Sequence, residues 1–213
     1  MIADIKTVSL ILGSGGARGL AHIGVIHWLE ENGYAIRSIS GCSMGALIGG
    51  VYAAGKLDVF TGWVRAITRT DMLKLLDISF GSSGMVKGEK IINTLKDLVG
   101  DQLIEDLPIT YTAVAADIIN EKEIWLNKGP LFDAIRASIS LPFFFTPARL
   151  NGVELLDGGI LNPVPIAPTF SDSTDIKIAV NLGGPVDKRI VDSSYEQHVQ
   201  AEPDLMDKIS RFI

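Results

Sequence analysis

The chain has 213 residues, of which 47% are hydrophobic and 21% are charged, which is enough apolar material for one α/β domain with a buried sheet. A net charge of −6 argues against a nucleic-acid partner and against electrostatic attraction to anionic lipid as the main mode of membrane contact. One cysteine, Cys42, excludes an internal disulfide and fits a reducing compartment, so we expect a cytoplasmic location. No signal-peptide pattern and no apolar stretch long enough to span a membrane is expected.

Strands and helices are predicted to alternate along most of the chain. Apolar runs predict strands at 7–12, 35–40, 108–116, 121–126, 153–156 and 176–182. Helical spacing of apolar residues predicts helices at 19–33, 43–54, 57–76, 87–99 and 131–139. The predicted strand at 176–182 is apolar on both faces, as in a buried parallel strand. This order is typical of an α/β three-layer sandwich with a mainly parallel central sheet.

The character of the chain changes near residue 184. We expect a catalytic domain over 1–184, followed by a polar tail over 185–213 that leads into a helix starting near Leu205. The helical spacing runs to the last residue, so this helix is expected to be truncated. Residues 77–88 are the least regular stretch and are interpreted as a connector, with a mobile flap as the alternative.

Residues 41–45 read Gly-Cys-Ser-Met-Gly, a G-x-S-x-G pattern between a predicted strand and a predicted helix. A serine on such a turn is held in a strained backbone conformation, with its hydroxyl at the edge of the sheet. The helix N-terminus behind it favours developing negative charge. This context predicts Ser43 as a nucleophile, and Met44 beside it is expected to contact the substrate.

A glycine-rich loop follows the first predicted strand, where residues 13–19 read Gly-Ser-Gly-Gly-Ala-Arg-Gly. Such a loop can cradle a dinucleotide or donate backbone N–H groups to an oxyanion. The spacing is one residue longer than the dinucleotide fingerprint, and the next strand ends in the Ser43 motif instead of an acidic ribose ligand. The oxyanion interpretation is therefore favoured, with Gly15 and Gly16 as donors. Arg18 either holds the shape of the loop, neutralises a phosphate head group of the substrate or forms a surface salt bridge.

A serine nucleophile needs a base, and histidine is the usual one. His22 is expected to be packed and hydrogen-bonded, and His27 to lie at the surface or at its boundary. His198 would complete the chain order of an α/β-hydrolase triad, but it lies in the polar tail with no strand to aim it. Asp157 ends a predicted strand and is followed by two glycines. We favour a dyad in which burial raises the basicity of Asp157, so that it accepts the Ser43 proton.

Taken together, these motifs resemble the patatin-like phospholipases, and the short, bacterial, single-domain branch in particular. The resemblance covers about residues 7–182. It includes the segments 137–142, Ala-Ser-Ile-Ser-Leu-Pro, and 162–165, Asn-Pro-Val-Pro. Ser14 departs from the family pattern, in which many members have a glycine at this position.

The resemblance implies a serine acyl hydrolase that cleaves fatty-acyl esters of phospholipids, lysophospholipids or related lipids. Carried over residue by residue, it implies a Ser43–Asp157 dyad without histidine. The oxyanion donors would be Gly15 and Gly16, helped by Ala17. The expected partners are a lipid or acyl-ester substrate and, transiently, a membrane surface.

Alternative functions stay open at this level. The chain could be an esterase or thioesterase acting on soluble acyl substrates, a nucleotide-binding α/β protein that uses the glycine loop, or a non-catalytic scaffold. No cluster of Asp, His and Cys has ligand spacing, so we expect neither a metal nor another cofactor. The aromatic run at 143–145 is interpreted as core, with an acyl groove as the alternative.

Overall fold

The computed structural model describes residues 5–68, 70–71 and 88–184. They belong almost entirely to one compact unit, residues 1–183. The predicted polar tail, its helix and His198 lie outside the described residues, as does most of the predicted connector.

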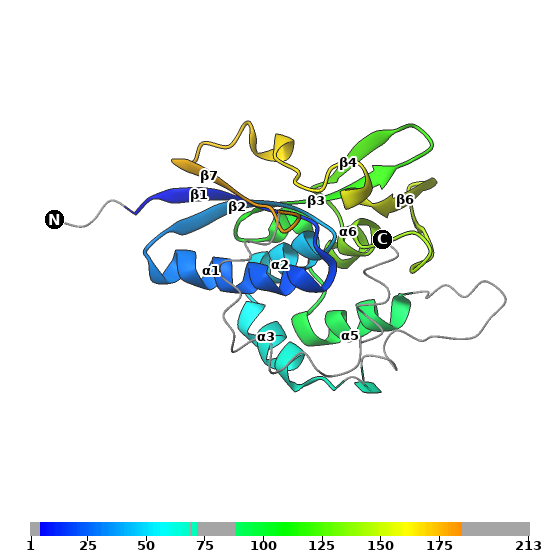
Figure 1. Cartoon of the computed structure of the whole chain (residues 1–213), viewed down its shortest axis with the longest axis horizontal. Helices are drawn as coiled ribbons and strands as arrows, with labels where there is room; N and C mark the ends of the chain where they lie inside the picture. The colour runs from blue at the N-terminus through cyan, green and yellow to red at the C-terminus, as the bar shows by residue number, and fades with distance from the viewer. Residues whose placement is uncertain (1–4, 69, 72–87, 185–213) are drawn as a thin grey trace. The chain divides into compact units, whose positions relative to one another are not determined.

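Within the described residues a seven-stranded sheet forms the centre of the unit (Figure 1). Its strands are β1 (Thr7–Leu12), β2 (Ala35–Cys42), β3 (Thr110–Asp117), β4 (Lys122–Leu126), β5 (Ala148–Leu150), β6 (Val153–Asp157) and β7 (Ile176–Val180). The order is β5-β6-β3-β2-β1-β7, and β4 also pairs with β3. Strands β7, β1, β2 and β3 run parallel, whereas β4, β6 and β5 are joined by antiparallel pairings. The predicted α/β fold with a mainly parallel sheet is confirmed.

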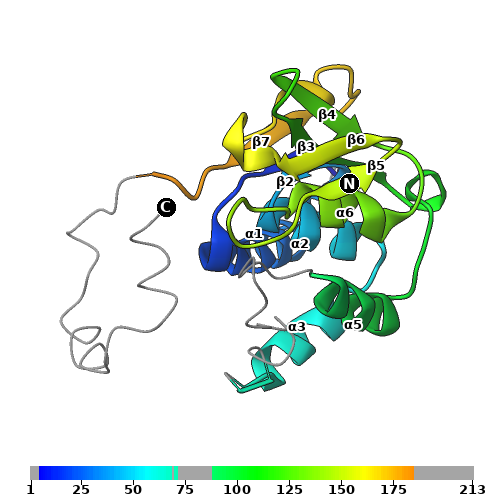
Figure 2. The same ribbon diagram turned by 90° about the vertical axis from the view of Figure 1, so that its right-hand side faces the viewer.

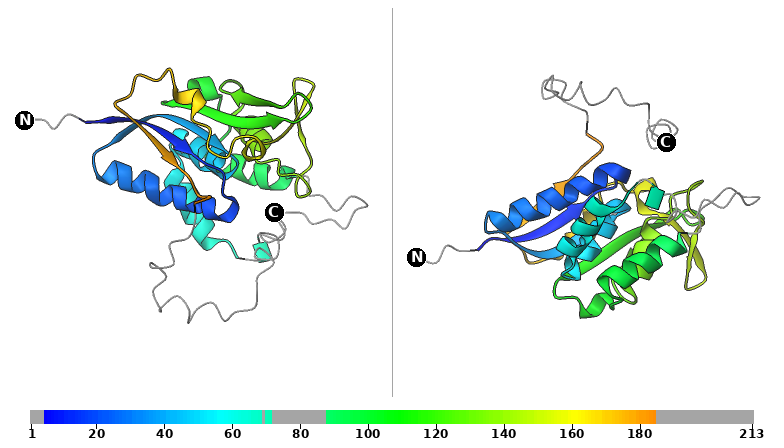
Figure 3. Two further views of the ribbon diagram at one scale, coloured as in Figure 1. Left: turned by 45° about the horizontal axis from the view of Figure 1, so that its top comes forward. Right: turned by 90° about the horizontal axis from the view of Figure 1, so that it is seen from below.

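The longer helices gather on one side of this sheet (Figures 1 and 2). They are α1 (Ala21–Glu31), α2 (Met44–Ala53), α3 (Leu57–Ala66), α5 (Glu89–Val99) and α6 (Leu131–Ser138). Helices α1, α2 and α6 contact the strands directly, and α3 and α5 contact those helices and each other. The other face is crossed by the segment 158–175, which contains the short 3-10 helices η3 (Gly158–Ile160) and η4 (Ala167–Thr169). Helices, sheet and this segment form the three layers seen in Figure 1, and the view from below in Figure 3 looks onto the helix layer.

Alternation along the strands explains why the two faces differ. Successive side chains of a strand point to opposite faces. Leu12 belongs to the apolar core beneath the helices. Ser9 and Ser40 instead face the segment 158–175, where their hydroxyls donate to Asp172 Oδ2 and to the Pro165 carbonyl, each at 2.8 Å. The apolar core therefore lies mainly between sheet and helices, and buried hydrogen bonds hold the other layer.

Two strands differ from the sequence prediction. β7 was predicted to be buried on both faces, which is wrong. Within the described residues it is an edge strand, and Lys177 and Ala179 are exposed along it. β5 was not predicted, because three residues carry too little pattern. It is joined to β6 by a two-residue turn in which Asn151 and Gly152 both have positive φ, the geometry of a tight hairpin.

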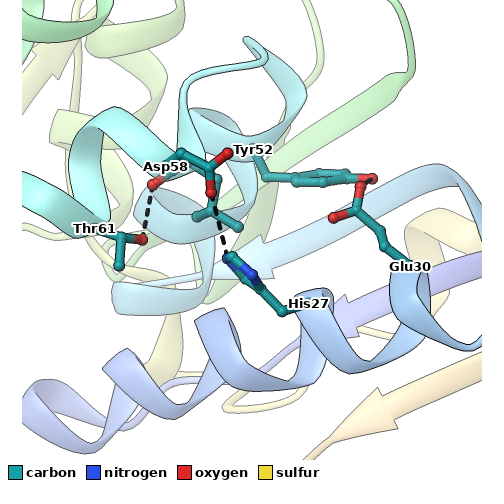
Figure 4. Close-up of polar contacts among 6 residues, drawn as sticks. His27, Glu30, Tyr52, Asp58 and Thr61 are labelled. Atoms are coloured by element: carbon teal, nitrogen blue, oxygen red, sulfur yellow. Dashed lines mark hydrogen bonds and ion pairs between the residues drawn. The ribbon is translucent and has the colours of Figure 1, made fainter.

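Polar contacts tie α1 to its neighbouring helices (Figure 4). The Tyr52 hydroxyl, near the end of α2, donates to Glu30 Oε1 of α1 at 2.8 Å. His27 Nε2 of α1 lies 3.7 Å from Asp58 Oδ1 of α3. The His27 side chain is 39% exposed, as predicted for a surface or boundary position. Contacts this exposed add little stability, so the helix layer depends mainly on its apolar core.

Helix α2 approaches the sheet so closely that glycine is required in its first turn. A Cβ added at Gly45 would lie 2.0 Å from the Leu12 carbonyl oxygen, and one added at Gly49 would lie 2.7 Å from Ile39 Cγ2. The Gly45 contact is with backbone, which cannot move aside without shifting β1. The second glycine of the G-x-S-x-G motif thus sets the distance between the helix that follows Ser43 and the sheet.

We expect Gly45→Ala to lower the free energy of unfolding by at least the roughly 1–3 kcal/mol typical of overpacking. Gly24→Ala is the matched control, because a Cβ on this exposed residue of α1 meets nothing within 4 Å. It should stabilise the protein by about 0.5–1 kcal/mol, the cost of glycine within a helix. Urea denaturation measures both. A Gly45→Ala variant with the wild-type midpoint would contradict the close approach.

Candidate active site

Ser43 occupies the turn between β2 and α2. Its backbone has φ 55° and ψ −128°, a conformation that non-glycine residues rarely adopt and that the surrounding structure must hold in place. A Cβ at Gly41 would lie 2.6 Å from the carbonyl oxygen of Gly45, so the turn is as tight as the motif predicts. The strained serine expected from the sequence is present.

Strand register brings Asp157 to this serine. Cys42 is paired with Val114 of β3, and the next residue, Ala115, is paired with Asp157 at the end of β6. Ser43 Oγ donates a hydrogen bond of 2.5 Å to Asp157 Oδ2. The two residues that the sequence singled out are therefore in direct contact.

The Asp157 carboxylate is buried, with 2% of the residue exposed. Its other oxygen, Oδ1, accepts a hydrogen bond of 2.8 Å from the Gly159 amide. Burial raises the pKa of Asp157 to about 6, because it penalises the charged form more than the hydrogen bonds from Ser43 and Gly159 favour it. Asp157 is thus a stronger base than an ordinary aspartate and is still ionised at neutral pH.

The glycine loop is anchored at its start by three hydrogen bonds. The Gly13 amide donates to the Val180 carbonyl at 3.1 Å, and the Ser14 amide donates to the Pro163 carbonyl at 2.8 Å. His22 Nε2 donates to the Gly13 carbonyl at 2.8 Å. His22 is fully buried and burial lowers its pKa, so this histidine is neutral and carries its proton on Nε2. It is packed and hydrogen-bonded, as predicted.

The loop then forms the 3-10 helix η1 (Gly16–Leu20). Gly16 has a φ of 52°, which favours glycine. Gly15 precedes η1, and Gly16 and Ala17 begin it, so their amides have no earlier helical turn to bond. Arg18 is exposed on η1, and its amide donates to the Gly15 carbonyl at 3.1 Å.

η1 lies against the first residue of α2. A Cβ at Gly19 would be 2.1 Å from Met44 Cγ, so this glycine leaves the space that the Met44 side chain fills. Met44, predicted to contact substrate, is half-buried at this junction. The contact joins the glycine loop to the turn that carries Ser43.

Residues 10–170 match the sequence profile of the family described as patatin-like phospholipase. The chain belongs to this family. An uncharacterised NTE family protein of Mycobacterium tuberculosis is 51% identical over 177 residues, which cover 83% of this chain and 49% of that protein. The lysophospholipase NTE1 of Saccharomyces cerevisiae is 31% identical over 191 residues, 86% of this chain and 11% of that protein. The chain thus spans about half the length of the mycobacterial relative and a small part of the yeast one.

Among solved structures, VipD from Legionella pneumophila matches with a TM-score of 0.52 and 17% identity, over 74% of this chain and 46% of that one. This likeness concerns the fold. Family membership supports hydrolysis of lipid esters and favours the hydrolase interpretation of the glycine loop over the nucleotide-binding one.

Two serines at the end of α6 were not singled out by sequence reasoning, although the segment 137–142 was noted as similar to the patatin-like family. The Ser43 amide donates to Ser138 Oγ, and the Asp157 amide donates to the Ser140 carbonyl, both at 3.0 Å. Their position in the family-like segment was the only signal for them in the sequence.

Cys42, directly before Ser43, is buried and its thiol points away from solvent. Its Sγ–H donates to the carbonyls of Asn162 and Pro163, each at 3.4 Å. Burial, and then the nearby Asp157 charge, raises the pKa of this thiol to about 12. Cys42 is therefore a packing residue beside the site and not a second nucleophile.

The aromatic run after α6 is only partly as predicted. Phe144 and Phe145 are half-buried with their rings edge to face, 4.8 Å between centroids. Phe143 was interpreted as core, which is wrong, because this residue is 96% exposed. Its backbone has a positive φ of 64°, which is uncommon for a residue other than glycine.

The part of the chain that the structure describes contains no group of three or more His, Cys, Asp and Glu side chains arranged to hold a metal ion. None of its helices combines the length and the apolar composition needed to cross a membrane.

We expect Asp157→Asn to be more stable than the wild type at pH 8. The folded pKa of about 6 lies above the ordinary 3.8, so the wild type loses stability as the pH rises through this interval, and a neutral amide does not. The advantage of the variant should shrink as the pH falls from 6 to 4 and vanish below that. Urea midpoints at pH 8, 6 and 4 measure it. A variant less stable than wild type at pH 8 would contradict the buried-carboxylate interpretation.

Proposed function

We propose that this chain is a serine acyl hydrolase that cleaves fatty-acyl esters of phospholipids, lysophospholipids or related lipids. The observation that carries the proposal is the 2.5 Å hydrogen bond from Ser43 Oγ to the buried carboxylate of Asp157. Membership in the patatin-like phospholipase family and the similarity to a lysophospholipase support the lipid substrate class.

In the proposed reaction, Ser43 Oγ attacks the acyl carbonyl carbon while its proton passes to Asp157 Oδ2. The tetrahedral oxyanion is held by the amides of Gly15, Gly16 and Ala17, at the start of η1. As the intermediate collapses, the ester C–O bond breaks and the leaving oxygen takes the proton from Asp157. Water, deprotonated in turn by Asp157, then attacks the acyl-enzyme. The acyl–Oγ bond breaks, Ser43 Oγ takes the proton back from Asp157, and the fatty acid is released.

A carboxylate base is favoured by where the described histidines lie. His22 is buried and donates to the Gly13 carbonyl, and His27 faces Asp58 on the helix layer. The raised pKa of Asp157 gives this residue the basicity that the step needs. We further propose that the exposed Arg18 meets the phosphate of a charged head group and that Met44 contacts the acyl chain.

The first test is hydrolysis of p-nitrophenyl esters of increasing acyl length. Ser43→Ala and Asp157→Asn should each lower kcat by roughly 10⁴-fold or more, because members of such a unit act together. Asp58→Asn, which changes an exposed carboxylate of α3, is the matched control and should keep wild-type activity. Longer acyl chains should be preferred, and kcat/KM should fall on the acid side with a midpoint near the Asp157 pKa of about 6.

The outcomes separate the alternatives. A folded Ser43→Ala variant with wild-type activity would exclude the dyad. Preference for the shortest esters would favour the soluble esterase or thioesterase alternative. Stabilisation by a nucleotide together with inactivity on every ester would favour the nucleotide-binding alternative.

We also propose that the enzyme meets its substrate at a lipid surface through Phe143. This side chain is 96% exposed and lies three residues after Ser140, whose carbonyl binds the Asp157 amide. An exposed phenyl ring close to a lipid-cleaving site can bury its apolar surface among acyl chains, which stabilises contact by about 1.5–3 kcal/mol.

Phe143→Ser should lower the ratio of activity on phosphatidylcholine vesicles to activity on p-nitrophenyl butyrate by about tenfold, the effect of about 1.4 kcal/mol. Phe170→Ser is the matched control, because it removes a ring that is 71% exposed at the end of η4. Vesicle co-sedimentation of both variants gives the binding directly. Equal ratios for the two variants would exclude Phe143 as the contact.

A further inference from the structure

The C-terminal end of α6 and the turn directly after it hold both members of the dyad by their backbone amides. The Ser43 amide donates to Ser138 Oγ, and the Asp157 amide donates to the Ser140 carbonyl, each at 3.0 Å. The two acceptors are only two residues apart in the chain, whereas Ser43 and Asp157 are separated by 114 positions. One helix end therefore sets the position of the nucleophile relative to its base.

Ser138 is the more specific of these two contacts, because it uses a side chain. The residue is fully buried, and its hydroxyl donates to the Val114 carbonyl at 2.6 Å. A serine hydroxyl has one proton, so this bond fixes its orientation and leaves a lone pair facing the Ser43 amide. Val114 is the register partner of Cys42 on the neighbouring strand. The hydroxyl thus bridges β3 to the residue that follows β2.

Two consequences follow for the nucleophile. The hydrogen bond helps to hold Ser43 in its rare backbone conformation, φ 55° and ψ −128°. It also occupies the Ser43 amide, which is then not free to bind the oxyanion. The oxyanion must be held by other amides, in agreement with the donors proposed on the glycine loop.

The turn after α6 is itself held firmly. Arg136 Nη1 donates to Ser140 Oγ at 2.6 Å, and Arg136 Nη2 donates to the Thr146 carbonyl at 2.8 Å. Gly158, next to the base, packs so closely that an added Cβ would lie 2.1 Å from the Val114 carbonyl oxygen, the same oxygen that Ser138 binds. These contacts leave little freedom for either Ser43 or Asp157 to move.

We propose that Ser138 is a positioning residue for the hydrolytic reaction: its hydroxyl sets the backbone of Ser43 so that Oγ stays aligned with Asp157, and it removes the Ser43 amide from oxyanion binding. The inference rests on the proposed acyl-hydrolase function. It concerns a residue that touches neither substrate nor reacting atoms, so its effect should appear in kcat and not in KM.

The test compares Ser138→Ala with Ser9→Ala on p-nitrophenyl esters. Ser9 is a matched control: it is also fully buried, and its hydroxyl also makes two hydrogen bonds, to Asp172 Oδ2 at 2.8 Å and Thr174 Oγ1 at 2.7 Å, on the β1 strand. Both variants should lower Tm. Only Ser138→Ala should lower kcat, by about 10–100-fold with KM within about twofold, because a misplacement of about 1 Å costs up to ~10²-fold in rate.

The inference is overturned if Ser138→Ala keeps kcat within twofold of wild type, if it changes KM alone, or if Ser9→Ala loses kcat to the same extent. Should Ser138→Ala fail to fold, Ser138→Cys replaces it, because a thiol fills the site and is a weak hydrogen-bond acceptor. The same loss of kcat is expected there.

A Ser43→Ala arm separates this inference from the function on which it rests. If Ser43→Ala hydrolyses the esters like wild type, the dyad fails and the role of Ser138 fails with it. If Ser43→Ala is inactive while Ser138→Ala has normal kcat, only the positioning role is excluded.

Discussion

The hydrogen bond between Ser43 Oγ and the Asp157 carboxylate requires a charged group to be held in a buried place. Burial of that charge outweighs the hydrogen bonds that favour it, which is why its pKa rises to about 6. Ser43 is uncharged, so no ion pair keeps its Oγ in contact with the Asp157 carboxylate. The surrounding fold must therefore supply rigidity through backbone contacts. The tight glycine contacts of α2 and the end of α6 supply it.

The two faces of the sheet fix different parts of the candidate site. On the helix face, close packing of α2 against β1 fixes how far Ser43 projects. On the opposite face, hydrogen bonds from the strands fix the segment that begins directly after Asp157 and runs to β7. The Ser14 amide joins this segment to the glycine loop through the Pro163 carbonyl. The candidate site thus lies where the two modes of packing meet, at the carboxyl ends of the parallel strands, as is usual in α/β folds.

The sequence predicted the parts of the site that depend on local chemistry. Ser43 was recognisable because a strand, two glycines and a helix must surround such a serine, and Asp157 because it follows a strand and precedes a turn. Ser138 was not recognisable in this way, since its hydrogen bonds to the Ser43 amide and the Val114 carbonyl are not encoded by any local spacing. Phe143 was misassigned because the apolar run 143–145 does not reveal that its first residue is exposed and has a positive φ. The hairpin of β5 and β6 could have been predicted from the Asn-Gly pair at 151–152, which is typical of a two-residue turn. The apolar pattern of the strands did not indicate it.

Cys42 gives the protein a practical property. The chain has one cysteine, and this thiol is buried, bonded to two carbonyls and shifted in pKa to about 12. Thiolate is the form that reacts with alkylating reagents, so the buried Cys42 thiol should not react with them at neutral pH. A cysteine introduced on the surface would then be the one reactive thiol in the folded protein. Fluorescent or spin labels could report on the neighbourhood of Ser43 without first removing the native cysteine beside it.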